Sequence, residues 1–160
     1  MGTEIERKFL VLNDAWRQSA RPGVRFRQGY FAGPRRASIR IRIEGEAANI
    51  NIKSATLGIH RQEYEYPIPL SDAEEMLETL CEKPLIEKTR YWVPCGGHIW
   101  EVDVFEGDNA GLVVAEVELD RIDAPVKPPE WVGEEVSGDP RYYNVSLVTH
   151  PYREWGTDGG

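Results

Sequence analysis

The chain opens with Thr3-Glu4-Ile5-Glu6-Arg7-Lys8-Phe9-Leu10, a stretch in which charged and apolar side chains alternate. Alternation with a period of two predicts a β-strand, because successive side chains of a strand point to opposite faces. Glu4, Glu6 and Lys8 then share one face. Two carboxylates on one face either repel each other or share a divalent cation bound through oxygen. The stretch therefore predicts a metal site next to a lysine that suits a bound anion.

Seven further stretches alternate in the same way and are predicted strands: residues 24–31, 38–44, 49–53, 61–66, 85–93, 99–105 and 112–119. The clearest is 38–44, where three isoleucines alternate with Arg40, Arg42 and Glu44. Apolar residues at helical spacing predict a helix over 71–80, and Asp139-Pro140 has the pattern of a second helix start. The fold class is therefore mainly β (α+β).

Eight strands that each have one charged and one apolar face predict an eight-stranded antiparallel closed β-barrel with flanking helices. The charged faces are expected to line the interior and the apolar faces to pack against the helices. Burial of so many charges in a dry core costs several kcal/mol per ion even with pairing. We therefore expect a water-filled tunnel for a highly charged ligand, in one domain over residues 1–160 with a frayed tail at 156–160.

Composition excludes several function classes. The net charge of −8 argues against nucleic acid as a partner, because a basic face is needed to neutralise its phosphates. No apolar run approaches the roughly 20 residues that a membrane span needs, so no membrane partner is expected. Cys81 and Cys95 lie far apart, with no cysteine or histidine at a zinc-ligand spacing, and this favours reduced thiols in the cytoplasm.

The candidate site residues are charged members of the inward faces. The acidic ones, expected to bind metal through oxygen, are Glu4, Glu6, Glu63, Asp103, Glu116 and Glu118. The basic ones, expected to contact phosphate oxygens, are Lys8, Arg40, Arg42, Lys53, Arg61, Lys88 and Arg90. The face of any one strand could equally be solvated, but the repetition over eight strands favours a polyanion bound together with hard cations.

The order of these motifs resembles the CYTH superfamily, also called the triphosphate tunnel metalloenzymes, over nearly the whole chain. The motifs are Glu4-Ile5-Glu6-Arg7-Lys8, Arg40-x-Arg42, Lys53, Arg61-Gln62-Glu63-Tyr64-Glu65, Glu87-Lys88-x-Arg90, Glu101-x-Asp103 and Glu116-x-Glu118. Arg27-Gln28-Gly29-Tyr30 and Tyr142-Tyr143-Asn144 are similar to its small bacterial members. The resemblance implies an enzyme that hydrolyses inorganic triphosphate (tripolyphosphate) to pyrophosphate and phosphate with Mg²⁺ or Mn²⁺.

The resemblance also implies a catalytic pair, Lys8 and Tyr30, in which the amine makes the phenol more acidic; a metal-bound water is the rival base. Nucleoside or thiamine triphosphatase, class IV-type adenylyl cyclase and non-catalytic polyphosphate-binding protein remain as alternatives. The retained acidic pairs favour an enzyme, and no segment is recognisably dedicated to thiamine or adenine. The expected partner is a small-molecule polyphosphate, and a homodimer stays open.

Overall fold

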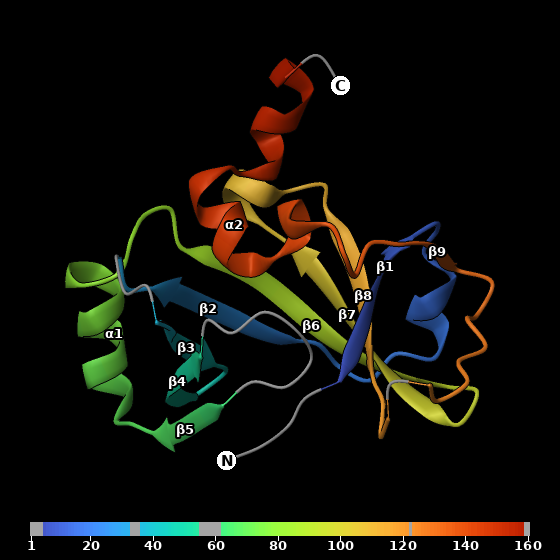
Figure 1. Ribbon diagram of the computed structural model, residues 1–160, viewed down its shortest axis with the longest axis horizontal. Helices are drawn as coiled ribbons and strands as arrows, with labels where there is room; N and C mark the ends of the chain where they lie inside the picture. The colour runs from blue at the N-terminus through green and yellow to red at the C-terminus, as the bar shows by residue number, and fades with distance from the viewer. Residues whose placement is uncertain (1–4, 33–35, 55–61, 122, 159–160) are drawn as a thin grey trace.

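The computed structural model of the protein describes residues 5–32, 36–54, 62–121 and 123–158 (Figure 1). The strands are β1 (Glu6–Val11), β2 (Val24–Tyr30), β3 (Ala37–Glu44), β4 (Ala47–Ser54), β5 (Glu63–Pro67), β6 (Ile86–Cys95), β7 (His98–Phe105), β8 (Val113–Glu118) and β9 (Val132–Glu135). The α-helices are α1 (Leu70–Thr79) and α2 (Asn144–Thr149). The 3-10 helices are η1 (Ala15–Gln18), η2 (Gly107–Asn109), η3 (Pro140–Tyr142) and η4 (Tyr152–Asp158). All eight predicted strands are present.

The described strands form one antiparallel sheet in the order β5-β4-β3-β2-β6-β7-β8-β1-β9. The prediction of eight strands is wrong, because β9 adds a ninth through its pairing with β1. At four residues, β9 is too short to show alternation. The prediction of a closed barrel is also not supported: within the described ranges, the edge strands β5 and β9 are not paired with each other. Alternation assigns each residue to a face, but it does not say which edge strands meet.

One face of the sheet packs against apolar elements. Ile41 and Ile43 of β3 contact Ala73 and Leu77 of α1, which lies at the left of Figure 1. The helix predicted over 71–80 therefore packs outside the sheet as expected. Leu77 is fully buried, and complete burial of a leucine side chain contributes about 1.5–3 kcal/mol.

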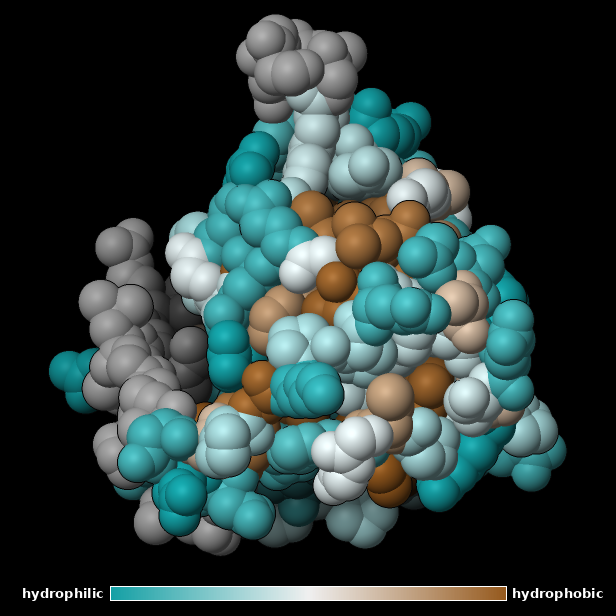
Figure 2. All heavy atoms as spheres, turned by 90° about the vertical axis from the view of Figure 1, so that its right-hand side faces the viewer, coloured by the Kyte–Doolittle hydropathy of each residue, from teal (hydrophilic) through white to brown (hydrophobic). Residues whose placement is uncertain are grey.

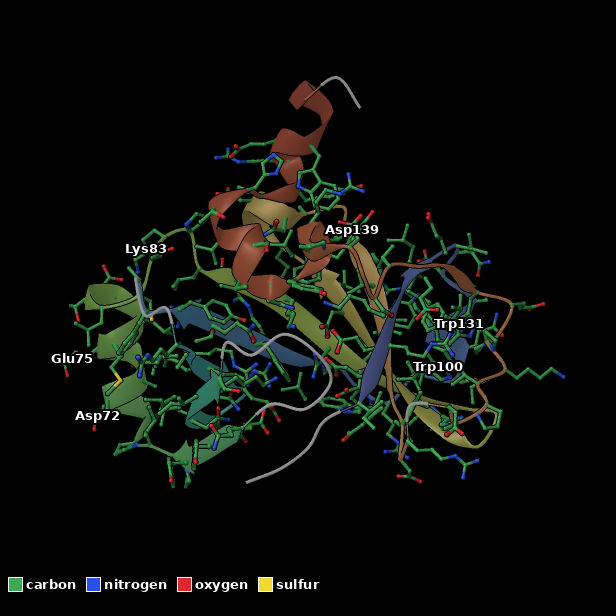
Figure 3. The ribbon with its side chains drawn as sticks, in the orientation of Figure 1. Asp72, Glu75, Lys83, Trp100, Trp131 and Asp139 are labelled. Carbon is green, nitrogen blue, oxygen red and sulfur yellow. The ribbon has the colours of Figure 1, made fainter. Side chains whose placement is uncertain are left out.

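A second apolar cluster lies at the opposite end of the sheet from α1. It includes Phe9, Val102, Trp100 and Trp131, and the rings of the two tryptophans are 5.8 Å apart in an edge contact (Figure 3). Figure 2 views the molecule from this end, where hydrophilic residues surround several hydrophobic areas. The cluster attaches the segment before β9 to the central strands.

The C-terminal segment covers part of the opposite face, above the central strands in Figure 1. Leu147 and Val148 of α2 pack there with Tyr30, Ile86 and other apolar residues of the sheet. This is the face that was expected to line a charged interior, but its strands become apolar where α2 covers them. The described chain ends in η4, Tyr152–Asp158, and the frayed tail at 156–160 stays a prediction.

No helix in the described part of the chain is long and apolar enough to span a membrane.

Candidate active site

The strand register brings the predicted site residues together on one face of the sheet, which we call the charged face. From β1 to β5 its predicted members are Glu6, Lys8, Glu118, Glu116, Asp103, Arg90, Lys88, Tyr30, Arg42, Arg40, Lys53 and Glu63. Residues directly opposite each other in neighbouring strands point to the same side. Glu6 is opposite Glu118, and Lys8 is opposite Glu116. The predicted residues Glu4 and Arg61 lie outside the described residues.

The centre of the charged face is a buried ionic cluster of Lys88, Arg90 and Asp103. The Asp103 carboxylate accepts one hydrogen bond from Lys88 Nζ over 2.8 Å and two from Arg90, from Nε over 2.7 Å and from Nη2 over 2.9 Å. Burial alone would raise the pKa of Asp103, but Arg90 and Lys88 outweigh it and hold that pKa well below its ordinary value. Three hydrogen bonds occupy most of the oxygen lone pairs of Asp103, so few are left for a metal ion.

Burial has the opposite consequence for the lysine of this cluster. It lowers the pKa of Lys88 to about 7, while the contact with Asp103 acts to raise it. The charged form of Lys88 therefore depends on its carboxylate partner. In the described structure, the cluster neutralises much of its own charge.

Arg42 on β3 is half-buried and differs from Arg90 because it forms no salt bridge with any acidic residue in the described ranges. Its Nε donates to Gln28 Oε1 over 2.9 Å, and its guanidinium lies 4.9 Å from the centre of the Phe26 ring. Burial, together with the charges of Arg40 and Arg90, lowers the pKa of Arg42 to about 10. A cation in such surroundings favours a bound anion.

Arg40, two positions away on the same strand, also has unused hydrogen-bond donors. Its Nη2 is 3.9 Å from Glu65 Oε2, a weak contact with a half-exposed carboxylate. Its Nε is buried and has no hydrogen-bond partner within the described ranges. A buried donor without a partner is costly, so this one favours a ligand oxygen. Arg40 and Arg42 together form the strongest anion-binding feature of the charged face.

The carboxylates gather on β1, β7 and β8. Glu101 lies opposite Glu116, and Glu6 opposite Glu118, with Glu6 and Glu118 both exposed. Burial raises the pKa of Glu101 against the effect of Arg90, and the neighbouring Glu116 raises it further. Crowded carboxylate oxygens of this kind suit a hard divalent cation. No cluster of three or more metal-ligating side chains occurs among the described residues, which do not include Glu4.

Lys8 and Tyr30 have separate partners in the structure. Lys8 Nζ donates to the Tyr142 carbonyl over 3.0 Å and lies 3.5 Å from Glu116 Oε1. The Tyr30 hydroxyl accepts a hydrogen bond from Gln28 Nε2 over 3.3 Å. Strands β8, β7 and β6 separate β1 from β2 in the sheet, and no hydrogen bond joins Lys8 to Tyr30 in the part that is described. The catalytic pair stays a prediction.

Three amide residues of the site were not predicted from the sequence. Gln28 is fully buried beside Arg42. Asn51 is 2% exposed and donates hydrogen bonds to Glu65 and, over 3.3 Å, to Glu63. The Glu63 carboxylate also lies 3.4 Å from Lys53 Nζ. Asn144 of α2 accepts from Lys88 over 3.1 Å. The alternation of β2 and β4 could have indicated Gln28 and Asn51, but only charged side chains were predicted as ligands. Gln28 and Asn144 belong to the motifs Arg27-Gln28-Gly29-Tyr30 and Tyr142-Tyr143-Asn144, which indicated the family without giving either amide a role.

Fold and site together define a β protein that collects lysines, arginines and carboxylates on one face of an antiparallel sheet, an arrangement suited to a polyanion with cations. The model of the CYTH domain family matches residues 2–152. The chain belongs to this family.

Relatives in this family are similar over most of their length. The chain is 49% identical to the inorganic triphosphatase of Acetivibrio thermocellus, over 97% of this chain and 99% of that protein. It is 41% identical to the inorganic triphosphatase of Nitrosomonas europaea, over 91% and 97% of the two chains. A solved structure of the inorganic triphosphatase NE1496 superimposes with a TM-score of 0.69 at 39% identity, over 92% of this chain and 95% of that one.

Proposed function

We propose that this protein hydrolyses inorganic triphosphate to pyrophosphate and phosphate, with Mg²⁺ or Mn²⁺ as cofactor. The observation that carries the proposal is the pair Arg40 and Arg42, which lacks a close acidic partner in the described ranges and lies on the same face as the carboxylates of β1 and β8. Desolvation of an unpaired charge costs several kcal/mol, which a bound polyanion would offset. The activity named for the two relatives at 49% and 41% identity supports this substrate.

In this proposal, Arg40 and Arg42 bind the phosphate oxygens, and Lys8, Lys53, Lys88 and Arg90 add positive charge. Phosphoryl transfer depends mainly on positioning and on neutralisation of charge. A water oxygen forms a bond to the terminal phosphorus, and the bond from that phosphorus to the bridging oxygen breaks. The electron pair of that bond leaves with pyrophosphate, and the cations that bound the substrate stabilise its charge.

The carboxylates of β1 and β8 fit a hard divalent cation by donor type. Glu4, Glu6 and Glu118 would hold it, with Glu63, Asp103 and Glu116 as further predicted ligands, although Asp103 already accepts three hydrogen bonds. When bound, the cation neutralises phosphate charge. Glu6→Gln and Glu118→Gln test this assignment, because each keeps the side-chain shape and removes the charge. Each should abolish turnover while the free energy of unfolding changes little.

If the predicted pair acts as the general base, Tyr30 has first lost its own proton, and its phenolate oxygen takes the proton of the attacking water. Tyr30→Phe should then lower kcat by about 10²–10⁴-fold with KM little changed. A kcat equal to that of the wild type would assign the proton to another base. This experiment is needed because the structure joins Tyr30 to Gln28 and Lys8 to Glu116.

Charge and redox chemistry support the proposed partner and location. We expect a small-molecule substrate rather than nucleic acid, which the net charge of −8 supports. Cys81 and Cys95 are free thiols, which supports a cytoplasmic location.

The test is a phosphate-release screen with inorganic triphosphate, ATP, thiamine triphosphate and long polyphosphate, each with Mg²⁺ and with Mn²⁺. Inorganic triphosphate should give the highest kcat/KM, and removal of the metal by chelation should stop the reaction. A preference for ATP or thiamine triphosphate would mean that inorganic triphosphate is not the main substrate. Formation of cyclic AMP from ATP would indicate a cyclase. Tight binding without release of phosphate from any of the four would indicate a polyphosphate-binding protein.

A further inference from the structure

Four side chains form a continuous hydrogen-bonded bridge across three strands and onto α2. Arg42 Nε on β3 donates to Gln28 Oε1 on β2 over 2.9 Å. Gln28 Nε2 lies 3.4 Å from Asn144 Oδ1 on α2, and Lys88 Nζ on β6 donates to the same oxygen over 3.1 Å. The bridge therefore connects the arginine that lacks an acidic partner to the buried lysine of the central cluster.

The two cations determine which way each amide points. Arginine and lysine side chains can only donate hydrogen bonds, so each must face an amide oxygen. Gln28 Oε1 therefore faces Arg42, and Asn144 Oδ1 faces Lys88. The Gln28 amide nitrogen is then left to donate to Asn144, and it also lies 3.3 Å from the Tyr30 hydroxyl. Rotation of either amide by half a turn would place two donors against each other, so the bridge has a single arrangement.

Amides at these two positions hold the cations without neutralising them. A carboxylate in place of Gln28 would form a salt bridge with Arg42 and compete with a bound anion. Gln28 is fully buried, so water cannot readily replace its contacts. We propose that Gln28 and Asn144 are positioning residues that fix Arg42 and Lys88 relative to each other for a phosphate-bearing ligand. This proposal rests on the proposed function and adds the residues that set the geometry of its binding cations.

The segment that carries Asn144 also holds the second lysine of the charged face. Lys8 Nζ donates to the Tyr142 carbonyl over 3.0 Å. Each lysine thus has one neutral oxygen acceptor from residues 142–144 and one carboxylate from the sheet, Glu116 for Lys8 and Asp103 for Lys88. The C-terminal segment contributes acceptors of fixed position to the site, in addition to its apolar packing.

Two variants test the bridge through the KM for inorganic triphosphate. Gln28→Met and Asn144→Ala should each raise KM about tenfold, the size of one lost hydrogen bond to a charged group, while kcat changes by a smaller factor. The double variant should be about as impaired as either single one, because both changes break the same bridge. The matched control is Val145→Ala, the next residue of α2, which is 46% exposed and should leave KM unchanged.

A second measurement tests the hydrogen-bonded bridge without enzyme turnover. Hydrogen exchange of Arg42 Nε–H, followed by nuclear magnetic resonance, should be slow in the wild type and in Val145→Ala and faster in Asn144→Ala, which does not touch Arg42 directly. If Gln28→Met fails to fold, the half-buried Asn144→Ala decides the question alone. Equal exchange in the wild type and Asn144→Ala, or an unchanged KM in folded and active variants, overturns the proposal. Slow exchange in a wild type that does not hydrolyse triphosphate contradicts only the proposed function.

Discussion

The charged face contains two regions that each contain arginine, but in opposite surroundings. In the central cluster, Arg90 forms three hydrogen bonds to Asp103 and Glu101 within 3.0 Å. On β3, the Nε of Arg42 bonds only to an amide oxygen, and the Nε of Arg40 bonds to nothing in the described ranges. In the first region carboxylates of the sheet neutralise most of the positive charge, and in the second that charge stays available for a ligand.

The order of the strands produces this difference. Strand β6 lies beside β7, which places Asp103 directly opposite Arg90. Strand β3 lies between β2 and β4, whose residues opposite Arg40 are Tyr30 and Asn51. Those opposite Arg42 are Gln28 and Asn49. Both β3 arginines are therefore flanked by uncharged side chains. A basic residue becomes a ligand site or a structural ion pair according to the strands on either side of it.

Removal of the central carboxylate should have the largest effect on stability. Asp103→Ala leaves Lys88 and Arg90 buried without their shared counter-ion, and the free energy of unfolding should fall by about 3–5 kcal/mol. Urea denaturation measures the change. Arg42→Met is the contrasting variant: it removes a desolvated cation but leaves Gln28 Oε1 without its donor, so we expect a change of about 1 kcal/mol or less. Equal losses in the two variants would show that the regions do not differ.

Ligand binding should depend more on the β3 arginines than on the central cluster, the reverse of the order expected for stability. Inorganic triphosphate at 100 times its dissociation constant should stabilise the wild type by about 2.7 kcal/mol. Arg42→Met should lose most of this stabilisation, because it removes a charge that faces the ligand. The matched control is Arg27→Met on the opposite face of the sheet, where the arginine lies 3.9 Å from Glu87. Thermal unfolding with and without triphosphate measures both, and a full shift in Arg42→Met would place the ligand elsewhere.

Acid should weaken the central cluster before it affects the β3 arginines. The native pKa of Asp103 lies below the value of about 3.9 expected in the unfolded chain, so its contribution to stability is complete above that pH and is lost as the pH falls toward the native pKa. The free energy of unfolding should therefore decrease below about pH 4. Urea denaturation at pH 7, 4 and 3 measures this decrease. Between pH 7 and pH 3 the free energy of unfolding should fall less in Asp103→Asn, if it folds, than in Arg42→Met. If the free energy of unfolding fell equally with pH in the two variants, Asp103 would not be the source of the acid sensitivity.

An exposed ion pair on the other face gives the smallest expected effect. Arg7 donates to both carboxylate oxygens of Glu135, over 2.9 Å and 2.6 Å, and so connects β1 to β9. Because both side chains are more than a third exposed, Glu135→Gln should cost at most about 1 kcal/mol, and 1 M salt should reduce the difference. Urea denaturation at two salt concentrations measures it. A loss as large as that of Asp103→Ala would mean that burial does not account for the strength of the central cluster.

The sequence by itself determined which residues share a face. Alternation with a period of two is a local property of an extended chain, so the strands and the membership of Arg40, Arg42, Lys88 and Glu116 in the charged face could be predicted from it. Helix α1 could be predicted for the same reason, because the helical spacing of its apolar residues is also a local property of the chain. The resemblance of the motifs then indicated the family correctly.

Only the tertiary structure decided which of these charges meet. Pairing between distant strands places Asp103 beside Arg90, adds β9 to the sheet, leaves its described edges unpaired and separates Lys8 from Tyr30 by three strands. Pairing of this kind depends on the energy of the whole packed sheet, and alternation within one strand contains no information about its neighbours. The same holds for Asn144, whose contact with Lys88 exists only because α2 packs across β2 and β6.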